Sequence, residues 1–287
     1  NWCEGIHSAC CGFLNGQKVY THRGGYIGFV ADLTSYLNWN QDNLLAVRVS
    51  AEYDPLTPPG KPQGGMDFYY YSGIYRDVEM IIADPLHITH ALEEDEVAGG
   101  GVFVTYPIVE KERAVAHVKT HIRNEGQYLR KAQLRTRMID KNGKVVACQQ
   151  DSFRLLAGEA LYIEQDLKID NPFLWHPYTP DLYRLESAVI ENDKVTDHCA
   201  EAVGIRTIAY TRDRGFFING EPLYLRGANR HQAFAYIGDA ASNSMQERDV
   251  IDLKRGGCNA VRAAHYPQDP AFLAACDKYG LLVVECI

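Results

Sequence analysis

The sequence has no run of about 18 consecutive apolar residues, the length that a membrane-spanning helix needs. It also has no cluster of Lys and Arg, and its net charge is -8 with a pI near 5.7. Nucleic-acid binders display a basic patch, so this composition argues against that class. We therefore expect neither a membrane nor a nucleic acid as a partner.

Several catalytic motifs are also absent. The chain has no Gly-x-Ser-x-Gly, no His-Glu-x-x-His and no Gly-x-Gly-x-x-Gly after a predicted strand. A nicotinamide-dependent enzyme needs a glycine-rich first βα loop, and Arg226-Gly227-Ala228-Asn229-Arg230 is not one. This removes the main support for an NAD-dependent α/β enzyme.

The eight cysteines form no Cys-x-x-Cys pair, and a chain of 287 residues that is 46% hydrophobic can bury a core without disulfides. We expect reduced thiols and a cytoplasmic location. The chain begins without Met and ends in the apolar run Leu281-Leu282-Val283-Val284 followed by three residues. A core strand needs a neighbour on each side, so we expect a chain cut at both ends.

Residues 1–84 are typical of an antiparallel β-sandwich or jelly roll. The pair Asn15-Gly16 between short apolar runs predicts a hairpin turn, and residues 44–49 and 78–82 predict strands. Residues 85–208 alternate with a period of two around a second hairpin signal, Asn142-Gly143. Short strands and turns over this length predict an immunoglobulin-like sandwich.

Residues 209–287 change to the pattern of a parallel α/β fold. We predict a strand over 222–229, a helix opened by a capping box at Ser244, a strand over 258–262, a helix from Asp269 to Gly280 and a strand over 281–284. The last strand has no polar alternation, which predicts burial on both faces. This order, βαβαβ, predicts right-handed crossovers and function at the carboxyl ends of the strands.

Polar residues follow two of these strands. Asn229-Arg230-His231 follows the first, and Arg262-Ala263-Ala264-His265 ends the second. A histidine beside cationic or amide groups at successive strand ends can hydrogen-bond a neutral substrate that has many hydroxyls. Lone histidines are more often structural, but their matched placement favours a role in binding.

Longer motifs make the chain resemble a known family. The motifs in the last region are Gly215-Phe216-Phe217-Ile218-Asn219-Gly220-Glu221-Pro222, Arg226-Gly227-Ala228-Asn229-Arg230-His231, Asn259-Ala260-Val261-Arg262-Ala263-Ala264-His265-Tyr266-Pro267 and Cys276-Asp277-Lys278-Tyr279-Gly280-Leu281. Upstream motifs are His22-Arg23-Gly24-Gly25-Tyr26, Ser72-Gly73-Ile74-Tyr75-Arg76-Asp77-Val78, Pro172-Phe173-Leu174-Trp175 and Pro180-Asp181-Leu182-Tyr183. In this order they resemble glycoside hydrolase family 2, the β-galactosidase and β-glucuronidase family.

The resemblance implies a jelly roll, an immunoglobulin-like sandwich and the first three strands of a (β/α)8 TIM barrel. It also implies retaining hydrolysis of terminal β-linked sugars by two glutamates at later strand ends, beyond Ile287. Neither Glu247 nor Glu285 fits either role, so we expect no catalysis by this segment alone. The full-length parent is expected to form a homo-oligomer.

Carried over residue by residue, the resemblance implies that His231, Arg262 and His265 hold substrate hydroxyls. Asp67 matches an aspartate that reaches the barrel mouth and can help to coordinate sodium. The run Phe68-Tyr69-Tyr70-Tyr71 has two interpretations, stacking on sugars or filling the sandwich core and hinge, and aromatic enrichment in strands favours the second.

Departures from the family leave alternatives open. Some relatives have Asp-Glu at the third strand end and begin a magnesium site there, whereas this chain has Glu285-Cys286, and a thiol is a poor magnesium ligand. Asp67 with His265 favours a β-galactoside or related oligosaccharide over the substrates of a β-glucuronidase or β-mannosidase. The alternative from another class is a non-catalytic carbohydrate-binding β-sandwich protein.

Overall fold

The computed structural model describes residues 2–94, 97 and 99–285. It divides into two compact units: one combines Asn1–Ile81 with Arg226–Ile287, and the other comprises Ile82–Leu225. The first unit is therefore built from two stretches that lie far apart in the sequence.

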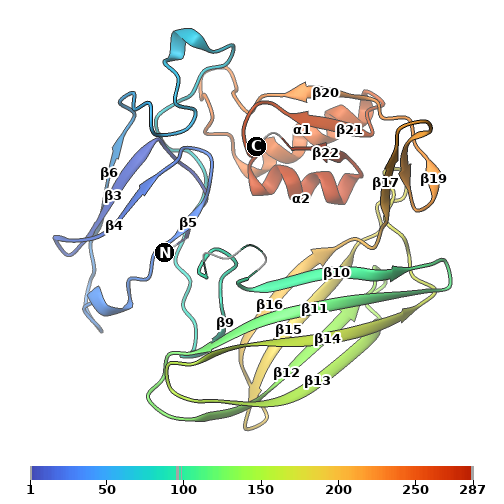
Figure 1. Cartoon of the computed structure of the whole chain (residues 1–287). Coiled ribbons are helices and arrows are strands. Elements are labelled where there is room, and N and C mark those ends of the chain that lie inside the picture. The colour runs from blue at the N-terminus through green and yellow to red at the C-terminus, as the bar shows by residue number, and fades with distance from the viewer. Residues whose placement is uncertain (1, 95–96, 98, 286–287) are drawn as a thin grey trace. The chain divides into compact units, whose positions relative to one another are not determined.

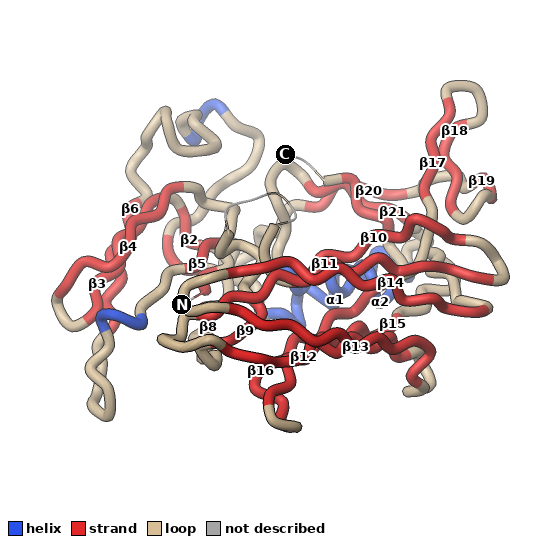
Figure 2. Tube along the Cα trace, turned by 60° about the horizontal axis from the view of Figure 1, so that its bottom comes forward, coloured by secondary structure: helices blue, strands red, loops and turns tan. Residues whose placement is uncertain are grey.

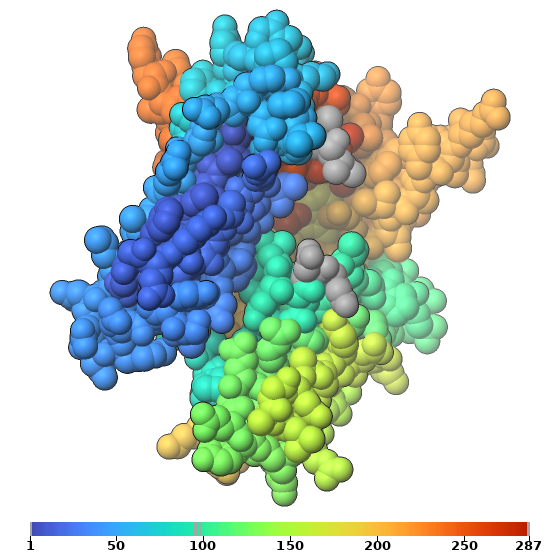
Figure 3. Space-filling model, turned by 60° about the vertical axis from the view of Figure 1, so that its left-hand side comes forward, coloured from blue at the N-terminus to red at the C-terminus, as the bar shows by residue number. Residues whose placement is uncertain are grey.

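Short antiparallel strands build the N-terminal part of the first unit (Figure 1). They are β1 (Trp2–Cys3), β2 (Ile6–His7), β3 (Ala9–Leu14), β4 (Gln17–Arg23), β5 (Phe29–Val30), β6 (Leu45–Ser50), β7 (Gly73–Ile74) and β8 (Val78–Glu79), with 3-10 turns at Thr34–Tyr36 and Gln63–Gly65. They pair in the orders β5-β1-β8, β4-β3-β6 and β2-β7. The β3–β4 hairpin lies at the surface, where it forms the dark blue face in Figure 3.

The turn of this hairpin follows from its sequence. Asn15 and Gly16 have φ of 52° and 83°, the left-handed conformation that both central residues of a type I′ turn require. The predicted hairpin is confirmed. Inward-facing residues of these strands, Cys3, Ile6 and Cys10, pack together as a small apolar core.

The C-terminal part of the first unit is a parallel βαβαβ segment, as predicted. Its elements are β20 (Gly227–Arg230), α1 (Asn243–Arg255), β21 (Ala260–Ala263), α2 (Pro270–Tyr279) and β22 (Leu282–Val284), with sheet order β20-β21-β22. Figure 2 shows both helices in blue, and both contribute to one core against the sheet. Val250 of α1, Val261 of β21 and Phe272 of α2 meet there, and burial of the Phe272 side chain contributes roughly 1.5–3 kcal/mol.

The helix boundaries partly follow the predictions. Asp269 caps α2 by accepting a hydrogen bond from Ala271 N, and Gly280 ends it at φ 82°, as predicted. The capping box at Ser244 is wrong, because the N-cap of α1 is Ser242, which has an extended backbone at ψ 158°. Burial of the last strand on both faces holds only in part, since on the sheet face away from the helices Leu282 is 7% exposed but Val284 is 50% exposed.

The second unit is a sandwich of two antiparallel sheets. One contains β9 (Leu86–Ile88), β10 (Val102–Val109), β11 (Arg113–Asn124) and β14 (Ala160–Asp170), and the other β12 (Arg130–Ile139), β13 (Val145–Leu155), β15 (Tyr183–Glu191) and β16 (Lys194–Val203). Apolar residues alternate along the strands and fill the core from both sheets, among them Val118, Leu167, Met138 and Leu185. The predicted second sandwich is confirmed.

A small three-stranded sheet follows in the same unit, with strands β17 (Ile208–Thr211), β18 (Gly215–Ile218) and β19 (Glu221–Pro222). The single strand predicted over 222–229 is therefore wrong. Pro222 ends the antiparallel β19, and the parallel strand begins only at Gly227. Among the described residues, no helix is long and apolar enough to cross a membrane.

Candidate functional site

Two predicted site residues meet at the carboxyl ends of neighbouring parallel strands. His231 directly follows β20, and His265 lies two residues after the end of β21. Their ring centroids are 5.6 Å apart, with an angle of 79° between the planes. The parallel register of β20 and β21 brings the histidines together, since the carboxyl ends of such strands lie at one edge of the sheet.

Two residues of the N-terminal sandwich join this pair. Phe68 lies 6.0 Å from each histidine ring and 5.2 Å from the ring of Tyr266. Asp67 Oδ2 lies 3.8 Å from His265 Nε2. The side chain of Asp67 is 79% exposed, so this contact contributes little to stability and leaves the carboxylate available to solvent or ligand.

The interpretation of residues 68–71 as core is supported for Phe68 and Tyr70, which pack against the buried cluster of Tyr26, Tyr75 and Tyr266. Phe68 lies among the site residues, and Tyr70 stacks on His7 at 4.7 Å. Tyr69 and Tyr71 are 68% and 41% exposed. The alternation of inward and outward rings is a strand-like pattern, and only proximity to Asp67 signalled that one inward ring belongs to the site.

The surroundings of His231 favour its neutral imidazole. Partial burial is the main cause that lowers the pKa of His231 below its usual value, and the neighbouring His265 and Arg230 lower it further, while Asp67 opposes them. A neutral ring donates one hydrogen bond and accepts another. Such a group suits sugar hydroxyls, which also do both.

Arg262, the remaining predicted residue, lies on β21 between Asn229 of β20 and Val284 of β22 in the sheet register. The two neighbours are exposed, and so is Arg262 itself. Val261 and Ala263 alternate with it and are buried, Val261 within the core against the helices. Arg262 thus belongs to the open sheet face, three residues before His265.

Stacked aromatic rings lie next to the two site histidines. Tyr26 of the sandwich stacks on Tyr266 at 4.4 Å and 7°, and it meets Tyr75 edge-on at 6.5 Å. The Tyr266 hydroxyl accepts a hydrogen bond from the backbone N–H of Gln232 at 3.1 Å. Burial raises the pKa of Tyr266 to about 12, so this hydroxyl stays protonated.

The two glutamates considered as catalytic groups have other surroundings. Glu247 on α1 accepts hydrogen bonds from Lys278 Nζ and Tyr279 Oη, both at 2.7 Å, and the first of these is the main cause that lowers its pKa. Burial raises the pKa of Glu285. Cys286, on which the argument against magnesium rests, lies outside the described residues.

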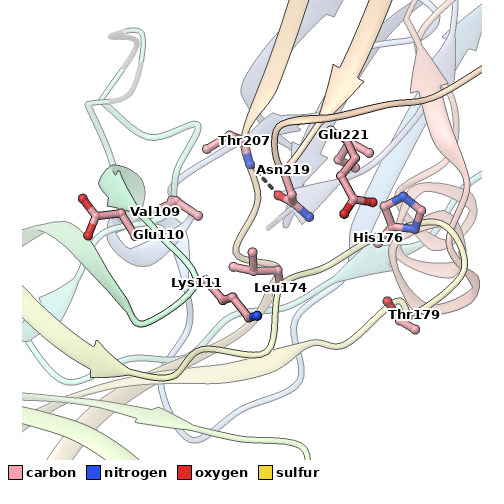
Figure 4. Close-up of a pocket in the computed structure, with 10 residues that line it drawn as sticks. Val109, Glu110, Lys111, Leu174, His176, Thr179, Thr207, Asn219 and Glu221 are labelled. Atoms are coloured by element: carbon pink, nitrogen blue, oxygen red, sulfur yellow. Dashed lines mark hydrogen bonds between the residues drawn. The ribbon is translucent and has the colours of Figure 1, made fainter.

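A separate hollow of about 430 Å³ lies in the second unit (Figure 4). Its lining residues are Val109, Glu110, Lys111, Leu174, His176, Thr179, Thr207, Ile218, Asn219 and Glu221. Asn219 uses its side chain structurally, since Oδ1 accepts from Thr207 N and Nδ2 donates to the Trp175 carbonyl, both at 3.0 Å. The hollow holds none of the predicted site residues.

Three family models match successive stretches of the chain. The sugar binding domain of glycosyl hydrolases family 2 matches residues 2–85, the glycosyl hydrolases family 2 model matches residues 100–206, and the TIM barrel domain of this family matches residues 210–286. The predicted fold class, a jelly-roll sandwich, an immunoglobulin-like sandwich and the start of a barrel, is confirmed.

Curated relatives agree. A protein named beta-galactosidase from Thermoanaerobacter pseudethanolicus is 36% identical over 286 residues, which cover 98% of this chain and 36% of that protein. Beta-galactosidase BoGH2A from Bacteroides ovatus is 32% identical over 98% of this chain and 31% of its own length. A putative beta-glucuronidase from Formosa agariphila is also 32% identical, over the same shares.

Solved structures are similar over the same extent. The Bacteroides uniformis beta-glucuronidase has a TM-score of 0.91 and 29% identity, with 99% of this chain and 33% of that chain covered. A family member from Bacteroides cellulosilyticus has a TM-score of 0.86 and 32% identity, with 99% and 37% covered. The chain thus spans about a third of the length of these proteins, and it belongs to the glycosyl hydrolases family 2.

Proposed function

We propose that this chain supplies part of the sugar pocket of a retaining glycosidase that removes terminal β-linked sugars. The observation that carries this proposal is the meeting of His231, His265 and Asp67 around the ring of Phe68. Hydrogen-bonding groups around an apolar ring match a sugar, which presents hydroxyls at its rim and C–H groups on its faces.

Each residue has a role in this proposal. The imidazoles of His231 and His265 exchange hydrogen bonds with hydroxyls, Asp67 accepts from a hydroxyl next to His265, and Phe68 packs on a sugar face. Arg262 donates from the adjacent strand. Hydroxyl contacts that strengthen as the sugar ring flattens also stabilise the transition state, so these residues affect rate as well as affinity in a complete pocket.

Hydrolysis with retention needs two carboxyls about 5–5.5 Å apart, one as nucleophile and one as acid and base. Glu247 is engaged with Lys278 and Tyr279, which supports the expectation that it is not one of them. The proposed function of this chain on its own is therefore binding without turnover.

A β-galactoside is the proposed substrate class. The names of the relatives at 36% and 32% identity, both beta-galactosidase, support it. Other relatives carry the name beta-glucuronidase, so glucuronate is the competing sugar in the experiment below. The proposed compartment is the cytoplasm, and seven free thiols among the described residues support it.

A sodium ion at Asp67 stays a proposal without support from the donor set. Among the described residues, no group of three His, Cys, Asp or Glu side chains could hold a metal. Asp67 offers one hard carboxylate, and the imidazole of His265 beside it at 3.8 Å is a nitrogen donor.

The test is a titration of the 287-residue chain with methyl β-galactoside and with methyl β-glucuronide, followed by NMR. We expect galactoside binding with a Kd on the order of millimolar and no release of nitrophenol from nitrophenyl β-galactoside. His265→Ala and His231→Ala each remove about 1 kcal/mol, which weakens binding roughly fivefold. His198→Ala, at an exposed histidine of the other unit, is the matched control and leaves binding unchanged.

Preferential binding of the glucuronide would replace galactose by glucuronate in the proposal. Turnover by this chain would contradict the assignment of its glutamates. Binding that survives both histidine variants would contradict the site, and binding of neither glycoside would contradict the function.

A further inference from the structure

Arg76 is a buried arginine that contacts both histidine-bearing loops. It lies between β7 and β8 in the N-terminal sandwich, and its side chain is 2% exposed. Its Nη2 donates to Gln232 Oε1 at 3.1 Å and to the Pro267 carbonyl at 2.7 Å, and its Nη1 donates to the Tyr26 carbonyl at 3.2 Å. One guanidinium thus joins three separate segments.

The partners of Arg76 stand next to the site residues. Gln232 directly follows His231 and is completely buried, and Pro267 lies two residues after His265. The two loops are also joined to each other, because Gln232 N donates to the Tyr266 hydroxyl. A shift of Arg76 therefore changes the backbone on which each histidine sits.

The charge of Arg76 is balanced within the same cluster. Asp269 Oδ2 lies 3.8 Å from Arg76 Nε, and the Asp269 side chain is 3% exposed. Its other oxygen caps α2 through Ala271 N at 2.8 Å. The guanidinium is consequently tied to the start of the helix that follows the His265 loop.

Only arginine meets these requirements. A guanidinium carries five N–H donors in a rigid planar fork, whereas a lysine ammonium is one nitrogen on a flexible stem. Lysine at position 76 keeps the charge near Asp269 but cannot reach the Tyr26 carbonyl, Gln232 and Pro267 in one fixed arrangement.

From this geometry we infer that Arg76 is a positioning residue that fixes the distance and orientation of His231 and His265 by holding the loops after both. The role as a positioner of sugar-binding groups rests on the proposed function. The N-terminal sandwich thus contributes to the pocket directly through Asp67 and Phe68 and indirectly through Arg76.

The experiment compares Arg76→Met, Arg76→Lys and Gln232→Leu in the 287-residue chain. Ring resonances of His231 and His265 are measured by NMR without sugar, and methyl β-galactoside is then titrated. We expect both histidines to shift in the two Arg76 variants, and His231 alone in Gln232→Leu. The ring resonances of His22, which stacks on Phe29 in the same unit, stay in place and report that this unit is still folded, and those of His198 do so for the other unit.

Galactoside affinity is expected to fall on the order of tenfold in Arg76→Met. Arg76→Lys is expected to recover part of the thermal stability but not the ring positions or the affinity, a separation that a purely structural role does not produce. If Arg76→Lys recovers thermal stability, ring resonances and galactoside affinity to the same degree, the inference is overturned.

If Arg76→Met and Arg76→Lys do not fold, Gln232→Leu decides alone, and unchanged His231 resonances in that variant overturn the inference. Failure of wild-type chain to bind galactoside overturns the proposed function only, because the ring resonances are read without sugar.

Discussion

Tyr26 and Tyr266 stack face to face at 4.4 Å, although they lie 240 positions apart in the sequence. The first belongs to the N-terminal sandwich and the second directly follows His265. The stack fixes the chain next to one site histidine, and the hydrogen bond from Gln232 N to the Tyr266 hydroxyl extends this support to the loop of the other.

Tyr26→Phe should leave stability unchanged or raise it by up to about 1 kcal/mol, because the buried Tyr26 hydroxyl has no hydrogen-bond partner among the described residues. Tyr26→Leu removes the stack and should cost about 2–4 kcal/mol. Urea unfolding of the two variants beside wild type checks both numbers. Equal losses in both would show that the hydroxyl, and not the ring, matters.

The burial of His7 leads us to expect that the N-terminal sandwich loses stability in acid. Burial lowers the pKa of His7 to about 4 from an ordinary 6.5, and neither ring nitrogen has a hydrogen-bond partner in the part of the chain that the structure describes. The unfolded chain therefore takes up a proton first as pH falls. Stability is complete above pH 6.5 and falls toward pH 4, by up to roughly 3 kcal/mol.

In His7→Phe this part of the pH dependence should vanish. Unfolding free energies at pH 7 and pH 5 measure it, with the signals of β3 as the probe. A variant that keeps the wild-type slope between these pH values would contradict the assignment to His7, whatever the absolute cost of the larger ring.

The surroundings of Glu4 lead us to expect the opposite dependence of stability on pH. Burial first, and then the charges of Asp269 and Asp77, raise its pKa from 4.5 to about 7. Between these values the folded state holds a proton that the unfolded state has lost, so stability falls as pH rises through this window.

Glu4→Gln should therefore gain stability relative to wild type as pH rises from 5 to 7.5, with little further gain above. Urea unfolding across this range measures the difference between the two. Glu52→Gln, at an exposed glutamate, is measured beside it as the control. If the difference in unfolding free energy between Glu4→Gln and wild type stays constant over this pH range, the raised pKa of Glu4 is contradicted.

We expect the hydroxyl of Tyr183 to contribute to the stability of the second unit. Its buried hydroxyl accepts a hydrogen bond from the backbone N–H of Phe173 at 2.7 Å, the contact of a tyrosine corner in immunoglobulin-like sandwiches. Tyr183→Phe leaves this N–H without its partner and should cost about 1–3 kcal/mol. Fluorescence of the buried Trp175 follows the unfolding, and the exposed Tyr210→Phe should cost nothing measurable.

Local chemistry made much of the fold predictable from the sequence. Asn15-Gly16 allows a left-handed turn at low cost, and Asp269 with Gly280 marks both ends of α2. The start of α1 was misplaced because Ser242 and Ser244 both precede helix-forming residues. The backbone N–H groups of Met245 and Gln246 bond to the Ser242 carbonyl, so the helix begins earlier than the motif at Ser244 suggests.

The site was only partly predictable. His231 and His265 stand at strand ends, a placement that the βαβ pattern reveals. Phe68 and Arg76 carry no such signal, because their partners lie far along the chain. The Arg76 bond to Gln232 spans 156 residues and its bond to Pro267 spans 191, and no periodic pattern extends over such distances.

The discontinuous first unit has a consequence for how the molecule folds during synthesis. Arg76 leaves the ribosome long before Gln232 and Pro267 are made. Its guanidinium therefore lacks these two partners while the whole intervening unit is synthesised. Contacts of such high sequence separation form late, which makes this step slow. Until then the rings of Tyr26 and Tyr75 lack the ring of Tyr266 that covers them, and transiently exposed apolar surface of this kind promotes aggregation.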